Sequence, residues 1–160
     1  MDKRALLDLV LADVMREIES LTAAAKATHE GATHEEARPE NDKDTRALEA
    51  SYLARGQAER VEQMQEVHTR LKFVELRDYA EDDAIGVGAV VRVEDEEGRE
   101  HVYFLVPIGG GRTVEHEGTT IVVLATGTPL GRALLGARVD DEVTLAIGTR
   151  KRELIVLSLE

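Results

Sequence analysis

The sequence predicts an α+β protein, in which an N-terminal antiparallel α-helical coiled-coil hairpin is followed by a small β-sheet domain with one short helix. Two observations support this fold class. Apolar residues of the first half recur at steps of three and four, whereas the second half consists of short runs rich in β-branched residues. We predict the hairpin at 1–78, a linker at 79–86 and the sheet domain at 87–160.

The first predicted helix lies within residues 2–29, and the second follows Asp44. The first helix has a coiled-coil seam at Leu7, Leu11, Val14, Ile18, Leu21, Ala25 and Thr28. The second has its seam at Ala47, Ala50, Ala54, Ala58, Val61, Met64, His68, Leu71 and Val74. Because large residues lie at the outer ends of both seams and small ones near the connection, antiparallel packing predicts a hairpin with a narrow tip. Gly56, inside the second helix, predicts a close contact between the helices.

Five strands are predicted in the second half. Their sequences are VGAVVRV, EHVYFLVP, TTIVVLA, EVTLAI and ELIVLSL. The EDEEG run at 94–98 predicts a hairpin turn, and GGGR with VEHEG predicts a longer loop before the third strand. Between the third and fourth strands, Pro129 fits the first turn of a short helix and Gly136 its C′ position. His101 is expected as a partly buried residue of the sheet.

Composition excludes several classes of function. The net charge is −12 and there is no block of Lys or Arg, which argues against direct DNA binding. The chain has no Cys, so disulfides, thiolate zinc sites and cysteine nucleophiles are excluded. The start MDKRALLDLV lacks the apolar region of a signal peptide, and no apolar stretch approaches the length of a membrane span. We therefore expect a soluble, cytoplasmic protein without a membrane partner.

An acidic segment at about residues 30–44 separates the two predicted helices and forms the hairpin tip. It offers six carboxylates, at Glu30, Glu35, Glu36, Glu40, Asp42 and Asp44. Mg²⁺ prefers such hard oxygen ligands. The alternative is structural, because acids before a helix complement its dipole and cap its first turn. His29 and His34 are five residues apart and do not share a helix face, so we expect no stably bound metal.

Two stretches resemble the Gre family of bacterial transcript cleavage factors. TPLGRALLGARVDDEV at 128–143 is similar to the family's Ser-Pro-Ile-Ala-Arg-Ala-Leu-Ile-Gly stretch followed by Gly-Asp. The matching positions are Pro129, Arg132, Ala133, Leu134 and Gly136. At the tip, Glu40 and Asn41 align with the family's Glu-Asn pair, and Gly56 falls on a glycine of the family's second helix.

The resemblance implies an FKBP-like C-terminal domain that docks at the rim of the secondary channel of bacterial RNA polymerase. The docking residues would be Thr128, Pro129, Leu130 and Arg132. It further implies that the coiled coil enters the channel, where two acidic tip residues help to hold the polymerase's second catalytic Mg²⁺ and a water while backtracked RNA is cleaved. Such a protein contacts the transcript only indirectly, and has no active site and no stably bound cofactor of its own.

The tip departs from the family pattern at one acid. The family reads Gly-Asp-Leu-Ser-Glu-Asn, whereas this chain reads EARPEN, with Ala37 at the position of the first acid. Glu40 matches the second acid, and the candidates to replace the first are Glu36, Asp42 and Asp44. Pro39 also restrains the preceding residue toward extended conformations.

Two other functions stay open at this point. An altered tip is compatible with a protein that enters the channel and inhibits the polymerase. An FKBP-like fold also suggests a prolyl isomerase or chaperone, but that activity needs an aromatic-lined pocket, and the C-terminal half supplies only Tyr103 and Phe104.

Overall fold

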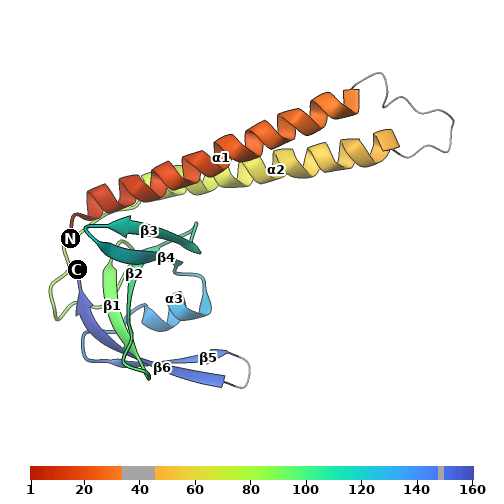
Figure 1. The fold of residues 1–160 in the computed structure, drawn as a ribbon. Coiled ribbons are helices and arrows are strands. Elements are labelled where there is room, and N and C mark those ends of the chain that lie inside the picture. Colours follow the sequence, from red (N-terminus) through yellow and green to blue (C-terminus); the bar gives the residue numbers. More distant parts are fainter. Residues whose placement is uncertain (34–45, 148–149) are drawn as a thin grey trace. The chain divides into compact units, whose positions relative to one another are not determined.

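The computed structural model describes residues 1–33, 46–147 and 150–160 (Figure 1). Its elements are α1 (Lys3–Thr33), α2 (Arg46–Lys72), β1 (Val90–Asp95), β2 (Glu100–Val106), β3 (Arg112–His116), β4 (Thr119–Ala125), α3 (Pro129–Leu134), β5 (Glu142–Ile147) and β6 (Arg150–Leu159). The predicted fold class is confirmed, with two long helices ahead of a sheet and one short helix. The chain forms two compact units, one of Met1–Leu11 with Thr69–Glu160 and one of Ala12–His68. The predicted boundaries at 78 and 87 stay predictions.

Burial along α1 follows the predicted coiled-coil seam. Val14 and Ile18 are buried, and the seam residues Leu21, Ala25 and Thr28 are each less exposed than the residues beside them. The polar side chains between these positions are mostly exposed. The seam is therefore an amphipathic stripe of the kind that packs a helix against its neighbour in a two-helix hairpin.

The seam of α2 differs from the prediction at one position. Ala58 is exposed, whereas Gln57 is half-buried and its Oε1 atom is fully buried without a hydrogen-bond partner in the described part of the chain. The half-buried positions Ala54, Gln57, Val61, Met64 and His68 are spaced by three and four in strict alternation, as a heptad requires. Sequence reasoning chose Ala58 because it is apolar, but the helical period places Gln57 in the seam. The side chains of Ala47 and Ala50 lie outside the described residues.

Gly56 does not make the close helix–helix contact that we predicted. A Cβ atom added to this residue would meet no heavy atom within 4 Å. Gly56 precedes Gln57, and a step of one residue turns a side chain away from the seam by about 100°. The glycine therefore weakens α2 without a packing advantage.

Replacing Gly56 with Ala should stabilise the protein. Alanine restricts the unfolded chain and suits a helix interior, so the free energy of unfolding should rise by about 0.5–1 kcal/mol, as measured by urea unfolding followed by circular dichroism. The matched control is Ala58→Gly, at an exposed position two residues further along α2. Its free energy of unfolding should fall by about the same amount. A loss of stability in Gly56→Ala would show that the helices do touch at this residue.

The sheet contains six strands in the order β3-β4-β2-β1-β6-β5, with β2 and β4 parallel and every other pair antiparallel. The prediction of five strands is wrong by one, because Arg112–His116, expected as part of a loop, forms β3 at one edge. This strand has a single buried apolar residue, Val114, which pairs with Ile121 of β4. One apolar residue in five is too weak an alternation for sequence reasoning to detect.

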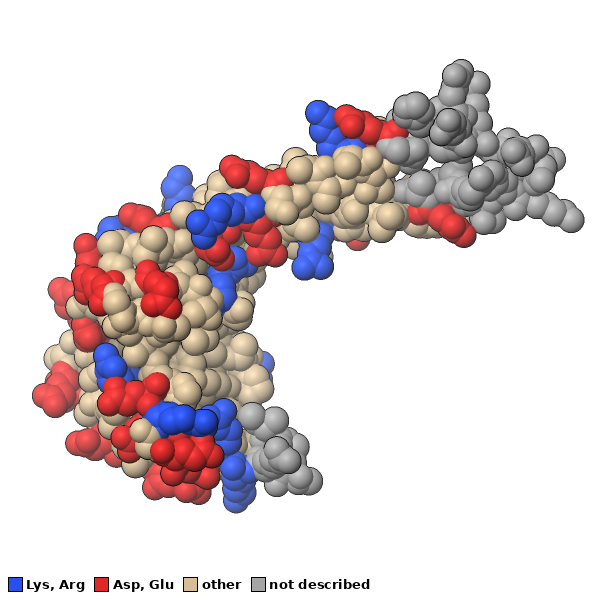
Figure 2. All heavy atoms as spheres, in the orientation of Figure 1, with Lys and Arg blue, Asp and Glu red and all other residues tan. Residues whose placement is uncertain are grey.

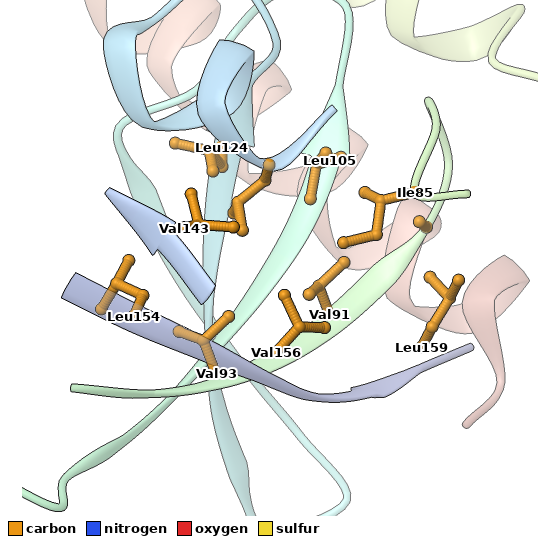
Figure 3. Packing of buried hydrophobic residues seen from close by; sticks show 11 residues of the cluster. Ile85, Val91, Val93, Leu105, Leu124, Val143, Leu154, Val156 and Leu159 are labelled. Carbon is orange, nitrogen blue, oxygen red and sulfur yellow. The ribbon is translucent and has the colours of Figure 1, made fainter. Parts of the chain in front are cut away.

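The core lies on the face of the sheet that carries α3. Side chains of five strands meet there in one cluster (Figure 3), to which α3 contributes Leu134. They are Val91, Val93, Leu105, Leu124, Val143, Leu154, Val156 and Leu159, with Ile85 from the preceding loop. The opposite face is also apolar over the central strands, because Phe104, Ile121 and Val123 are fully buried. Both faces of these strands therefore need a cover.

Candidate functional site

The predicted docking segment is a short capped helix that follows β4. The Thr128 hydroxyl accepts a hydrogen bond from the Gly131 amide at 3.1 Å and donates one to the Ala125 carbonyl at 2.8 Å. Thr128 is thus the N-cap of α3, with Pro129 at the first helical position. Gly136, at φ 83°, follows the C-cap Leu135. The predicted positions of Pro129 and Gly136 are confirmed.

Close backbone contacts fix α3 to the rest of the sheet domain. A Cβ atom on Gly131 would lie 2.3 Å from the carbonyl oxygen of Ala125, so only glycine allows this approach. At the other end of the helix, Gly136 donates to the Ile85 carbonyl at 2.9 Å, and Ile85 donates to the Ala137 carbonyl at 2.8 Å. The helix is therefore tied to the end of β4 and to the loop before β1, which makes its outer side chains a rigid surface.

The four predicted docking residues divide into exposed and structural positions. Pro129 and Arg132 are exposed, and they can contact a partner. Leu130 is partly buried against the core cluster, and the Thr128 side chain is engaged in the cap. Leu135, 39% exposed, is an apolar side chain at the end of α3 that sequence reasoning missed. The sequence does contain a signal for an exposed leucine here, because the adjacent helical residues Leu134 and Leu135 cannot both point into one core.

The predicted tip residues Glu36, Glu40, Asp42 and Asp44 lie outside the described residues, as does Ala37. The described part of this region shows that α1 continues to Thr33, beyond the predicted end at 29.

Charged side chains on the described surface form neither a metal site nor a basic face in the view drawn. Within residues 1–33, 46–147 and 150–160, no group of three His, Asp or Glu side chains is arranged to hold a metal ion. Figure 2 shows acidic and basic side chains interspersed over the described helices and sheet domain, without a continuous basic surface on the face drawn. No helix in the described ranges is long and apolar enough to cross a membrane.

Asp95 organises a cluster of polar groups at the turn between β1 and β2. Its side chain is only 2% exposed, and its Oδ1 atom accepts hydrogen bonds from the amides of Glu97 and Arg99, both at 3.0 Å. Its Oδ2 atom lies 2.9 Å from Arg99 Nε, 3.0 Å from His101 Nε2 and 3.6 Å from Arg152 Nη2. Both oxygens are thus occupied within the protein, so the carboxylate serves the fold and does not offer a ligand site.

The cluster builds the hairpin between β1 and β2. The Gly98 amide donates to the Asp95 carbonyl at 2.8 Å, and Gly98 has a φ of 73°, a conformation that favours glycine. The predicted EDEEG turn is confirmed, as is the partly buried position of His101. The hydrogen bond with His101, followed by those from Arg99 and the two amides, holds the pKa of Asp95 well below its usual range, although burial acts in the opposite direction.

The depressed pKa of Asp95 predicts a pH-dependent contribution to stability. A carboxyl with a lower pKa in the folded state stabilises that state above its unfolded pKa of about 3.9, and loses this contribution as the pH falls through the folded value. Asp95→Asn should therefore be less stable than the wild type at pH 7, and the difference should shrink at pH values below about 4. Urea unfolding between pH 7 and pH 2 measures this difference.

The control for this experiment is Glu97→Gln, because Glu97 is an exposed acid in the same turn. This variant should change stability little at any pH. A stability difference between wild type and Asp95→Asn that stays constant down to pH 2 would contradict the assigned role of the carboxylate.

The sequence pattern of the family described as "Transcription elongation factor, GreA/GreB, C-term" matches residues 80–160, half of the chain. The chain therefore belongs to the GreA/GreB family of transcription elongation factors. This match contains α3 and every strand of the sheet. No curated protein matches the chain.

Solved structures similar to the chain include relatives from three bacteria. GreA factor homolog 1 (Gfh1) of Thermus thermophilus is 20% identical, with a TM-score of 0.39 and coverage of 94% of each chain. Gfh1 of Thermus aquaticus is 19% identical, with a TM-score of 0.39 and coverage of 96% of this chain and 95% of its own. GreA/GreB of Nitrosomonas europaea is 20% identical, with a TM-score of 0.36 and coverage of 64% and 90%. At these scores the likenesses add nothing to the fold described above.

Proposed function

We propose that the chain binds bacterial RNA polymerase through its C-terminal domain, inserts its helical hairpin into the secondary channel and stimulates cleavage of backtracked RNA. The observation that carries the proposal is the GreA/GreB match over residues 80–160. The surface of α3 supports the proposal, because Pro129, Arg132 and Leu135 are exposed there and can contact a partner. Among the described residues after residue 80, α3 is the only helix. The chain then acts on the catalytic site of the polymerase.

The two long helices give the chain the reach that this function requires. At about 1.5 Å per residue, the 31 residues of α1 span about 46 Å. The acidic segment between α1 and α2 contains Glu40 together with Glu36, Asp42 and Asp44. A hairpin of this length can therefore deliver carboxylates to a site that the sheet domain itself does not enter.

Carboxylates suit this role because of how Mg²⁺ binds. In a two-metal site the ions lie about 3.5–4 Å apart and stabilise the attacking and leaving oxygens. Mg²⁺ takes one or two carboxylates and fills the rest of its octahedral shell with water and substrate oxygens. Glu40 and one of the neighbouring acids would complete the shell of the weakly held ion, which belongs to the polymerase.

RNA cleavage in a backtracked elongation complex tests the proposal. The wild-type chain should accelerate cleavage, and Glu40→Gln should reduce the acceleration by at least about tenfold, the usual scale for loss of a group that supports a metal ion. Glu19→Gln is the matched control, because Glu19 is an exposed acid on α1 away from the tip. This variant should accelerate RNA cleavage as much as the wild type does. Unchanged cleavage and an unchanged elongation rate with the wild-type chain would refute the proposal.

Inhibition of the polymerase from the same channel is the second candidate function. The observation that favours it is Ala37, which stands where the family carries its first tip acid. Ala37→Asp restores the family's acid and separates the two functions. If the chain inhibits, the wild type should slow elongation without cleavage and the variant should gain cleavage; if the chain already stimulates cleavage, the variant should change the rate by less than about tenfold.

A further inference from the structure

A surface groove in the unit that contains the sheet is independent of both the tip and α3. It has a volume of about 390 Å³, and its apolar wall is formed by Phe73, Val74, Tyr79, Val87 and Pro107. The groove thus lies where the chain leaves α2 and enters the sheet domain, and all its lining residues fall within Thr69–Glu160.

Phe73 is the feature that needs an explanation. It is 76% exposed, the highest value of any large hydrophobic side chain in the described ranges. The whole chain has only five aromatic residues of the Phe and Tyr types, and two of them lie in this groove. Scattered single apolar residues are normal on a surface, but an exposed aromatic beside a further exposed apolar residue, Val87, is typical of a binding site.

The part of this wall formed by Tyr79 and Val87 is preformed. The Tyr79 hydroxyl donates a hydrogen bond to the Val87 carbonyl at 2.8 Å, and the Arg77 guanidinium stacks on the Tyr79 ring at 4.2 Å from its centroid. Lys3 donates to the Arg77 carbonyl and so ties the same segment to the start of α1. A Cβ atom on Gly86 would lie 2.7 Å from the Tyr79 hydroxyl, so this glycine is what allows the close fit. Binding of a ligand therefore costs little conformational entropy in this part of the groove.

Charge indicates which ligand fits. Residues 70–77 contain three cations, at Arg70, Lys72 and Arg77, against one acid, Glu75, in a chain whose net charge is −12. Arg70 and Arg77 line the groove together with Glu75, so two cations face one acid there. Arg77 is 59% exposed, and its contact with Asp83, at 3.9 Å, is too long for a strong ion pair. An anionic ligand is therefore attracted to this groove more than to the acidic surface elsewhere.

We propose that the groove binds an extended acidic peptide segment of a protein partner, whose single aromatic or large aliphatic side chain packs on Phe73 while its carboxylates lie beside Arg70 and Arg77. A peptide fits both properties of the site, because an inorganic anion would leave Phe73 uncovered and an apolar molecule would gain no attraction from the two arginines. The proposal goes beyond the polymerase function and does not depend on the tip.

Fluorescence anisotropy of a labelled peptide tests the proposal with the full chain. The probe is a fluorescein-labelled peptide with one phenylalanine flanked on both sides by glutamates. We expect saturable binding that weakens as salt is added, and a loss of affinity of about tenfold in Phe73→Ala and in Arg77→Gln. Arg77→Lys keeps the charge but not the planar stack on Tyr79, so it should fall between wild type and Arg77→Gln.

The matched control is Tyr52→Ala, since Tyr52 is an aromatic residue of α2 that is 67% exposed and lies outside the groove. This variant should bind the probe like the wild type. Equal binding of a peptide with lysines in place of the glutamates, or wild-type affinity in Phe73→Ala, would overturn the proposal. So would sedimentation that shows a dimer of the chain which Phe73→Ala dissociates, because a second copy would then be the occupant.

Discussion

Burial of both faces of the central sheet is the constraint on which the rest of the structure depends. On one face, Leu134 of α3 joins the core cluster. On the other face, Phe104 and Ile121 are fully buried. The described residues of the C-terminal half contain no second helix that could cover this face. The same compact unit contains Leu6 and Leu71, which are fully buried and come from the ends of α1 and α2.

Each of the two long helices contributes residues to both compact units. α1 is one helix from Lys3 to Thr33, and it crosses the division between the two compact units at Leu11 without a break. The same holds for α2 at His68.

The sequence predicts the features that rest on strong periodicity, and it fails where a feature rests on geometry alone. The seam of α1 and the cap positions around α3 were predictable, because apolar spacing and the Pro and Gly preferences of helix ends are local properties. Gln57 was missed because a polar residue is not expected in the seam, although the helical period places it there. The strand β3 was missed because pairing with β4, more than its own composition, holds it in the sheet. Phe73 lies between the predicted seam positions Leu71 and Val74, and only the structure shows how far its side chain is exposed.

The proposed function requires the hairpin to bring the acidic segment to the magnesium site of the polymerase. Replacing that Mg²⁺ with Fe²⁺ and generating hydroxyl radicals cuts any protein backbone that lies close to the metal. Mapping the fragments of an end-labelled chain bound to the polymerase then locates the part of the chain nearest the metal. The proposed function predicts cuts confined to residues near Glu40; cuts within the sheet domain, or none at all in a complex that is demonstrably bound, would contradict it.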